Sequence, residues 1–461
     1  MQIQLPEKVE YIINTLEAAG YEAYAVGGCV RDSLLNREPD DWDITTSARP
    51  QQVKEVFPRT IDTGIQHGTV TVMMGKEGFE VTTYRIDGEY EDSRHPKEVI
   101  FTANLIEDLK RRDFTINAFA YNHRSGIVDA FDGMTDLKNG IIRCVGEAKE
   151  RFTEDALRMM RAVRFSAQLG YDIEEKTKQA IVELAPNLKN ISAERIQVEL
   201  VKLLQSPHPD YLRVAYELGM TKIIMPEFDK AMEIPQNNPH HIYNVGEHLL
   251  HTLLEVRPDR SLRIAALLHD IAKPDTETKD SEGISHFHGH AEAGEEKATA
   301  ILRRLKFDND TINKVKKYVK YHDYKIEATP RAVRRALNKI GKEYFQEVLE
   351  LKKADMLAQS TYQREEKEEN LTQVTAIYKE ILQKQECVSL KELVVTGKDI
   401  IELGVPQGKQ LGAVLQSLLE EVLENPQHNT KEYLSEKVKQ MIVRTKVQFI
   451  KDISGFHRSR V

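Results

Sequence analysis

The chain has 461 residues and a formal net charge of −8 at pH 7, which argues against coating nucleic acid through bulk positive charge but not against a local basic groove. Its three cysteines are widely spaced, which argues against a disulfide framework and against a cysteine zinc site. There is no apolar signal core at the start and no apolar run near the ~18 residues of a membrane span, so we expect a cytoplasmic protein without membrane contact. At ~150 residues per domain, the length allows about three domains.

Short β-branched runs alternate with short helices up to about residue 139, and long helical periodicity dominates beyond it. This change predicts an α/β head followed by a mostly α-helical remainder. The first strand is expected at 24–26, and a helix at 29–35 follows a turn formed by Gly27 and Gly28. Free N–H groups at such a helix start can cradle a triphosphate.

Arg31 and three carboxylates are the candidate phosphate and metal ligands of the head. Arg31 offers a bidentate contact to phosphate. Asp41 and Asp43 would share one face of a strand, and such a pair can hold one or two Mg²⁺ ions that activate a hydroxyl and neutralise a leaving pyrophosphate. Glu80, in the strand-like run 78–84, is the candidate third ligand. An Asp-x-Asp pair alone is more often a solvated turn, so the prediction depends on the glycine segment upstream.

A basic cluster followed by an apolar run occupies residues 109–120. Arg112 is the candidate second phosphate contact, facing the metal ions. Asp113 and Asn117 are expected to brace the fold, and an ordinary surface helix would also explain the charges. Residues 132–137 are typical of a turn and mark the end of the head.

Residues 154–165 predict a helix in which Asp155, Arg158 and Arg161 recur every third position, with Arg164 extending the stripe. A solvated arginine stripe is the alternative. Cytosine and adenine present an amino donor beside a ring-nitrogen acceptor, whereas uracil and guanine present a carbonyl beside an N–H. An aspartate acceptor beside an arginine donor therefore matches C and A. Asp155 and Arg158 predict base selection, and Arg161 and Arg164 would hold the triphosphate or orient the acidic partner.

Histidines and aspartates recur on predicted helices between residues 240 and 355. Imidazoles and carboxylates that converge from several helices can form a mono- or binuclear metal site, although a lone histidine on a helix is more often packed or solvated. The constellation consists of His248, His269, Asp270, His290, His322 and Asp355. Beyond it, the closing residues 437–461 are locally basic, which suits phosphate contacts or a frayed tail.

The motifs of the first 205 residues, taken in order, resemble those of the bacterial class II tRNA nucleotidyltransferases, the CCA-adding enzymes. The motifs are GGxVRD with DxD at 27–43, RRDFTINA at 111–118, DGxxDL at 132–137, EDALRxxR at 154–161 and ISAERIxxEL at 191–200. The resemblance implies a head of the polymerase-β type and untemplated addition of C, C and A to tRNA from CTP and ATP. Asp41 and Asp43 match the metal-binding carboxylates of the family. The matching nucleotide-binding positions are Gly28, Arg31, Arg112, Asp155, Arg158, Arg161 and Arg164.

The resemblance also suggests a domain order: a nucleotidyltransferase head, a helical neck with the base-reading helix, body helices, a metal-dependent domain and a helical tRNA-binding tail. We expect these at 1–140, 141–205, 206–240, 241–365 and 366–461. The order of histidines and aspartates resembles the HD phosphohydrolase family, which implies a transition metal such as Mn²⁺ or Ni²⁺ and hydrolysis of nucleotide or RNA-end phosphates. The six residues of the constellation match its metal positions.

Two alternatives remain open. A polar loop between residues 84 and 101 favours full CCA addition, because CC-only members lack its signature; its signature residues here are Asp87, Tyr90, Asp92 and Arg94, with His95 where a second arginine is common. An A-only enzyme or a poly(A) polymerase is the alternative within the fold. A phosphohydrolase with an inert head is the alternative of another class. The oligomeric state has no signature in the sequence.

Overall fold

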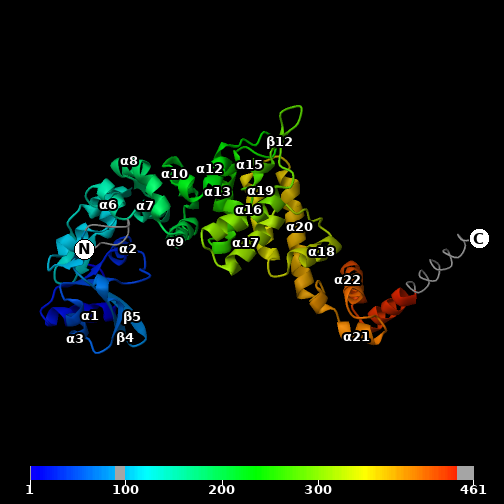
Figure 1. Cartoon of the computed structure of the whole chain (residues 1–461), viewed down its shortest axis with the longest axis horizontal. Coiled ribbons are helices and arrows are strands. Elements are labelled where there is room, and N and C mark those ends of the chain that lie inside the picture. Colours follow the sequence, from blue (N-terminus) through cyan, green and yellow to red (C-terminus); the bar gives the residue numbers. More distant parts are fainter. Residues whose placement is uncertain (1, 89–98, 444–461) are drawn as a thin grey trace, which may run out of the picture. The chain divides into compact units, whose positions relative to one another are not determined.

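The fold is that of a computed structural model, which describes residues 2–88 and 99–443 (Figure 1). Two compact units are present. The first comprises residues up to Pro235 with Asn244–Leu267 and Thr299–Ile312, and the second comprises Gln236–Tyr243, Leu268–Ala298 and residues from Asn313 onward. Among the described residues, no helix combines the length and the apolar character that crossing a bilayer requires.

A seven-stranded mixed sheet in the order β3-β4-β5-β2-β1-β8-β9 builds the head of the first unit. Its strands are β1 Ala23–Val26, β2 Ile44–Thr46, β3 Thr60–Gly64, β4 Thr69–Met74, β5 Glu77–Thr83, β8 Phe119–Asn122 and β9 Gly126–Asp129. Only β2 and β5 pair in parallel within this sheet; the other neighbours are antiparallel. The two-stranded pairs outside it are β6 Arg85–Asp87 with β7 Val99–Phe101, β10 Ile141–Ile142 with β11 Asp172–Ile173, and β12 Thr278–Lys279 with β13 Ser285–His286.

Short helices cover this sheet, and Figure 1 shows α1 and α3 beside β4 and β5. The head helices are α1 Glu7–Ala18, α2 Gly28–Leu34, α3 Pro50–Val56, α4 Leu105–Lys110 and α5 Gly133–Asn139. Helix α1 buries Val9, Ile12, Ile13 and Leu16, whose spacing forms one apolar stripe that packs against β1. A buried cluster that includes Tyr84 and Leu109 fills the core beneath the sheet.

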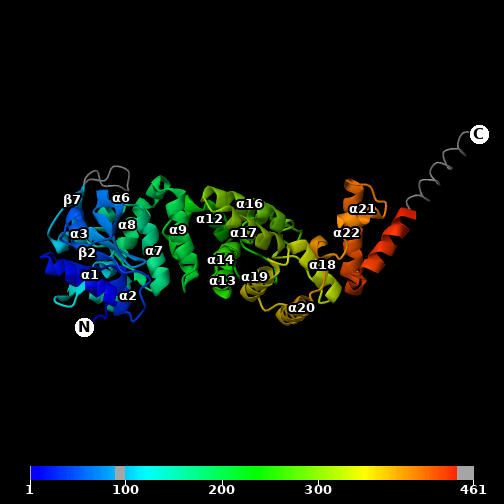
Figure 2. The ribbon, with the colours of Figure 1, turned by 90° about the horizontal axis from the view of Figure 1, so that it is seen from below.

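Helices form the rest of the first unit, and Figure 2 shows α7 alongside α9, with which it packs closely. Those that end before residue 256 are α6 Ala148–Glu154, α7 Leu157–Leu169, α8 Glu175–Leu184, α9 Ala193–Leu204, α10 Leu212–Glu217, α11 Thr221–Ile224, α12 Pro226–Glu233 and α13 Val245–Glu255. In the base-reading segment, the apolar residues Ala156, Leu157, Met160 and Val163 are all buried. The predicted α/β head followed by a helical remainder is therefore confirmed.

The prediction of a single helix over residues 154–165 is wrong at its first turn. Helix α6 ends at Glu154 and α7 begins at Leu157, so the chain bends between them. Asp155 has extended backbone angles, φ −145° and ψ 102°. Its carboxylate accepts from the Leu157 backbone N–H at 3.1 Å, and such local side-chain bonds are the reason that aspartate favours helix ends over helix interiors.

The remaining helices lie between residues 260 and 443. They are α14 Arg260–Leu268, α15 Lys273–Thr276, α16 His290–Arg304, α17 Asn309–Tyr321, α18 Pro330–Ile340, α19 Phe345–Ala358, α20 Arg364–Gln383, α21 Gly397–Glu402 and α22 Lys409–Glu424, followed by helical residues 431–443. Of the predicted loop signature, Asp87 ends β6, and Tyr90, Asp92, Arg94 and His95 lie outside the described residues. The basic closing segment lies outside them beyond residue 443.

The glycine of the DGxxDL motif begins α5 in a site with no room for a side chain. A Cβ at Gly133 would lie 2.4 Å from the backbone oxygen of Thr115 and 2.8 Å from the Phe119 ring. We therefore expect Gly133→Ala to destabilise the head by ~1–3 kcal/mol, because a backbone oxygen cannot move aside as a flexible side chain can. Urea unfolding followed by the fluorescence of Trp42, the only tryptophan, measures this. Gly412→Ala in α22, where a Cβ meets nothing within 4 Å, is the control and should leave the Trp42 transition unchanged.

Candidate functional site

The three predicted carboxylates of the head, Asp41, Asp43 and Glu80, line one cavity of about 540 Å³ together with Asp40 and Glu77. Asp41 and Asp43 come directly before β2, and Glu80 lies on β5. Strands β2 and β5 pair in parallel, with Ile44 opposite Val81. This register places Asp43, the residue before Ile44, beside Glu80, the residue before Val81. The structure thus brings the three predicted ligands to one place, although their oxygens are not all within 4.8 Å of one another.

The charges in this cavity suit a divalent cation. Partial desolvation and the negative charges of Asp41 and Glu80 raise the pKa of Asp43, and the guanidinium of Arg112 opposes them. Carboxylate oxygens are the ligands that Mg²⁺ prefers, and an ion that drew the three groups together would relieve their mutual repulsion. Asp41, Asp43 and Glu80 therefore fit a magnesium site.

Arg112 lies directly over the glycine turn. A Cβ on Gly27, which has φ +83°, would lie 2.9 Å from Nη1 of Arg112, so the close approach of the guanidinium depends on glycine. Arg112 also faces Asp108, with 3.7 Å between the charged groups. Burial lowers its pKa, but an arginine stays charged at physiological pH. The guanidinium of Arg112 therefore lies beside Gly27, and its charge acts on Asp43.

Arg31 is buried and held on three sides. It donates to both oxygens of Asp32 at 2.9 and 2.8 Å and to Oδ1 of Asn117 at 2.6 Å. Its guanidinium lies 5.0 Å from the ring centroid of Phe165 on α7. Asn117 in turn donates to Asp113 at 3.2 Å, so the residues expected to brace the fold join the glycine helix to α7.

Asp155 and Arg158 lie at the bend between α6 and α7, each held by a partner. Arg195 of α9 makes a two-pronged contact to Asp155, at 2.7 and 3.2 Å. Arg158 donates to Glu154 at 2.6 Å and to the backbone oxygens of Arg111 and Arg151. Both side chains are only partly exposed, so their orientation is set before any base arrives.

The last two arginines of the predicted stripe hold acidic residues of the fold. Arg161 donates to Asp113 at 2.7 Å. Burial alone would raise the pKa of Asp113, but Arg161 and Arg158 lower it to about 2. Arg164 is buried, donates to Glu199 at 2.5 Å and stacks 3.7 Å from the Phe165 ring centroid. Arg164 is therefore not on a solvated stripe.

Sequence reasoning missed Arg195 and Glu199 of α9. Both belong to the quoted ISAERIxxEL run, four residues apart, and i,i+4 spacing predicts that they lie on one helix face. That face meets α7, where the two residues pair with Asp155 and Arg164. The signal in the sequence was that the two motifs, about forty residues apart, carry residues of opposite charge that can pair with one another.

The second unit gathers Asp270, His290 and His322 into a buried cluster. The Nε2 atoms of the two histidines are 3.3 Å apart, and each lies 3.3 to 3.4 Å from Oδ1 of Asp270. Nδ1 of His290 is 2.7 Å from the Phe287 carbonyl oxygen, and Nδ1 of His322 is 2.7 Å from the Val319 carbonyl oxygen. Because a carbonyl only accepts, each Nδ1 carries the proton and each Nε2 presents its lone pair to the cluster.

This geometry fits a transition metal. Two imidazole lone pairs facing each other repel unless a cation lies between them, and a backbone hydrogen bond on the far nitrogen is the usual support of a metal-binding histidine. Burial lowers the pKa of His290, which favours the neutral, ligating form. Burial would raise the pKa of Asp270, but Lys273 and His269 hold it well below its usual range. The three residues could therefore hold a divalent ion near neutral pH.

Three predicted ligands remain: His248, His269 and Asp355. Nε2 of His269 lies 3.3 Å from Oδ2 of Asp270 and 3.8 Å from Oδ1 of Asp355 on α19, so both border the cluster. Lys273 pairs with Asp270 at 2.7 Å and was not among the predicted residues. His248 is fully buried on α13, a helix of the first unit.

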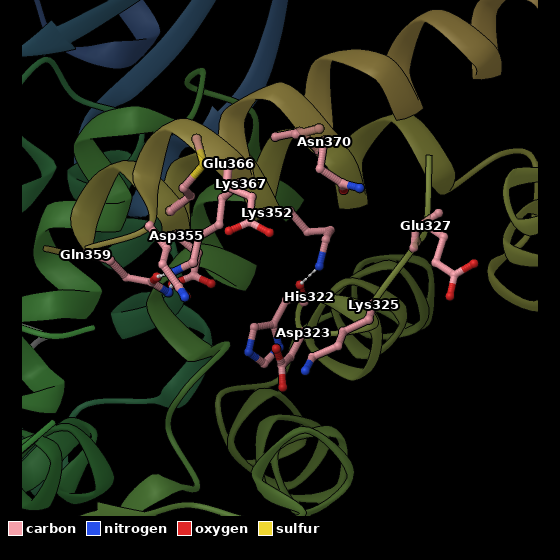
Figure 3. Close-up of a pocket in the computed structure, with 14 residues that line it drawn as sticks. His322, Asp323, Lys325, Glu327, Lys352, Asp355, Gln359, Glu366, Lys367 and Asn370 are labelled. Atoms are coloured by element: carbon pink, nitrogen blue, oxygen red, sulfur yellow. Dashed lines mark hydrogen bonds between the residues drawn. The ribbon is translucent and has the colours of Figure 1, made fainter. Parts of the chain in front are cut away.

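A chamber of about 510 Å³ adjoins this cluster, lined by side chains of α19 and α20 and of the segment after α17 (Figure 3). It includes His322 and Asp355 of the predicted set, together with Lys325, Lys352 and Lys367. Burial lowers the pKa of Lys352 and Lys367. Sequence reasoning missed these lysines, because they are spread over a charge-rich region without a spacing that marks them.

Family models match three stretches of the chain. The poly(A) polymerase head domain matches residues 23–143, the probable RNA- and SrmB-binding site of polymerase A matches 170–232, and the tRNA nucleotidyltransferase domain 2 matches 276–438. The crystal structure of the Bacillus stearothermophilus CCA-adding enzyme in complex with CTP is 32% identical, with a TM-score of 0.71, over 96% of this chain and 100% of that chain. The chain belongs to the CCA-adding enzyme family.

Membership in the CCA-adding enzyme family confirms the polymerase-β-type head with a mostly helical remainder. CCA-adding enzymes of Leuconostoc mesenteroides and Enterococcus faecalis are each 55% identical, over 204 and 193 residues. These matches cover 44% and 42% of this chain and 51% and 48% of the relatives, so the chain spans about half the length of the curated relatives it matches. The Thermotoga maritima CCA-adding enzyme complexed with tRNA shares the fold, with 20% identity and a TM-score of 0.58 over 96% of this chain and 100% of that chain.

Proposed function

We propose that this protein adds C, C and A to the 3′ end of tRNA, using CTP and ATP and releasing pyrophosphate. The observation that carries the proposal is the cavity shared by Asp41, Asp43 and Glu80, in the same unit as the Asp155 and Arg158 pair. The family supports the substrates, because relatives are named CCA-adding enzymes and the B. stearothermophilus structure contains CTP. The reaction takes place in the cytoplasm, where tRNA and both nucleotides are present.

The reaction is a displacement at the α-phosphorus. The 3′ oxygen of the tRNA forms a bond to it, the bond to the bridging oxygen breaks, and pyrophosphate leaves as the hydroxyl proton passes to solvent. Asp41 and Asp43 would hold Mg²⁺ with help from Glu80, and the bound ion would activate the hydroxyl and neutralise charge on the leaving group. Arg31 and Arg112 would contact the triphosphate.

The residues at the bend between α6 and α7 select the nucleotide. The Asp155 carboxylate accepts from the amino group of C or A, and Arg158 donates to the adjacent ring nitrogen. Arg161 and Arg164 orient this pair or reach the triphosphate beside Gly28. We also propose that the chain is divided into five parts. They are a head at 1–140, a neck at 141–205, a body at 206–240, an HD domain at 241–365 and a tRNA-binding tail at 366–461.

Incubation with tRNA that ends at its discriminator base, with CTP or ATP singly and together, tests the proposal. CTP alone should add two residues, and both nucleotides together should add three. Failure to incorporate C would sink the CCA assignment. Incorporation of A alone would favour an A-only enzyme, and long A tracts on unrelated RNA would favour a poly(A) polymerase.

Arg195→Ala should relax the choice of base. Without its two-pronged contact, Asp155 loses its fixed orientation, and discrimination against U and G should fall ~10- to 100-fold, about 1–3 kcal/mol. Misincorporation from UTP and GTP, measured as ratios of kcat/KM, gives the answer. Lys202→Ala, an exposed cation on the same helix, is the matched control and should keep the wild-type ratio.

A second candidate function is a metal-dependent phosphohydrolase in the HD segment. The convergence of Asp270, His290 and His322, with both Nε2 atoms directed inward, favours it. These residues would bind Mn²⁺ or Ni²⁺, with His248, His269 and Asp355 as further ligands, and a bound ion would activate water toward a phosphate. If the head were inert, Asp41→Ala would leave every activity intact while His269→Ala abolished it.

A further inference from the structure

Two lysines line the chamber beside the cluster of Asp270, His290 and His322, and neither has an assigned role. Lys352 of α19 and Lys367 of α20 both line the chamber of about 510 Å³. A second cavity of about 720 Å³ shares Lys367 and Asp355 with it and reaches Asp270 and His290. The two cavities therefore adjoin each other within the second unit.

Both ammonium groups donate hydrogen bonds to neutral acceptors, and that of Lys367 also lies beside a histidine. Nζ of Lys352 donates to the backbone oxygen of His322 at 2.8 Å, a bond drawn as a dashed line in Figure 3. Nζ of Lys367 donates to Oε1 of Gln359 at 2.8 Å and lies 3.3 Å from Nδ1 of His240. Neither bond cancels a positive charge.

One of the carboxylates that act on the two lysines also borders the cluster of Asp270, His290 and His322. Asp323 and Asp355 are the carboxylates whose charge reaches both ammonium groups. Asp355 is also a proposed metal ligand, and a carboxylate bound to a divalent ion has little charge left to offer a lysine. A metal ion bound to Asp355 would therefore reduce the negative charge that acts on the ammonium groups of Lys352 and Lys367. Glu327 and Glu366 also line the chamber.

We propose that Lys352 and Lys367 form an anion subsite that binds a second phosphoryl group of the substrate whose reacting phosphate lies at Asp270, His290 and His322. The inference rests on the proposed phosphohydrolase function and names its substrate class, a small phosphate compound with two phosphoryl groups. The chamber lies within the ~300–1,000 Å³ typical of small-molecule sites. Charge-assisted bonds from two ammonium groups favour phosphate oxygens over neutral groups. Further amides that line the chamber, Gln363 and Asn370, suit the hydroxyl groups of a nucleoside.

The test compares a substrate with two phosphoryl groups, ADP, with one that has a single group, p-nitrophenyl phosphate, on the full chain loaded with Mn²⁺. Lys352→Gln with Lys367→Gln should raise KM for ADP at least tenfold and leave KM for p-nitrophenyl phosphate within twofold. Lys367→Gln alone, at a half-exposed position that does not endanger folding, should shift KM for ADP in the same direction. Lys353→Gln, an exposed lysine next to Lys352, is the matched control.

Equal changes for both substrates, or no change for ADP, would overturn the subsite while leaving the hydrolase in place. If the wild type hydrolyses neither substrate, the phosphohydrolase proposal fails and calorimetry with inorganic phosphate decides on the subsite. Phosphate affinity that rises with Mn²⁺ and falls at least tenfold in the double variant supports it. Affinity that is absent, or the same in wild type and variant, overturns it.

Discussion

Asp43→Asn is expected to lower the rate of C and A incorporation into tRNA by at least ~10³-fold, which corresponds to ~4 kcal/mol of transition-state stabilisation. The amide cannot supply the negative charge that would hold Mg²⁺ beside Asp41 and Glu80. Primer extension on a tRNA that lacks its CCA end measures the rate. The effect should fall on kcat more than on the KM for CTP, because the phosphate contacts come from arginines.

Glu77→Gln is the matched control for this experiment. Glu77 lines the same cavity and begins the same strand as Glu80, but it forms an ion pair with Lys8. An exposed pair of this kind is worth little to stability, so the variant should keep a near wild-type rate. If Asp43→Asn retains more than a tenth of the wild-type rate, Asp43 is not a metal ligand.

His322→Ala should weaken Mn²⁺ binding to the second unit by at least ~100-fold and abolish hydrolysis of p-nitrophenyl phosphate. It removes the imidazole whose Nε2 lies 3.4 Å from Asp270 and 3.3 Å from that of His290. Calorimetric titration with Mn²⁺ gives the affinity, and a colorimetric assay gives the rate. CCA addition by the same variant reports whether the head is still folded.

His286→Ala provides the comparison for His322→Ala. His286 lies on β13 and pairs with Asp280 at 2.9 Å, and it is not one of the three residues whose ligand atoms meet at Asp270, His290 and His322. Mn²⁺ affinity should be unchanged in this variant. A loss as large as that of His322→Ala would mean that the metal binds the histidine-rich segment itself rather than the buried cluster.

Prediction from the sequence succeeded where local spacing carries the information. Asp41 and Asp43 line one cavity, although they lie just before β2 and not on the strand expected to carry them, and the apolar positions of α7 are buried as their periodicity indicates. Glu80 could be named only as a candidate, because its position beside Asp43 depends on the pairing of two strands. The metal ligands, the domain limits and the loop signature around Tyr90 stay predictions.

Prediction failed where long-range contacts decide the structure. The bend at Asp155 breaks a pattern that is periodic enough for one helix, because Arg195 and the Leu157 N–H hold the carboxylate outside it. The sequence leaves a solvated stripe open as an alternative for Arg164, which is buried against Phe165 and Glu199. Periodicity reports which residues share a face, not which partner covers that face.

The single parallel pair of the head sheet has a consequence for the order of folding. Strands β2 and β5 are separated by the whole β3–β4 excursion, and β1, the neighbour of β2, must wait for β8 nearly a hundred residues later. Pairings of such long sequence separation form slowly, because loop closure precedes any gain from contact. A nascent chain therefore carries Asp41 and Asp43 before β5 can place Glu80 beside them, and the sheet that holds all three is complete only after translation has passed β9.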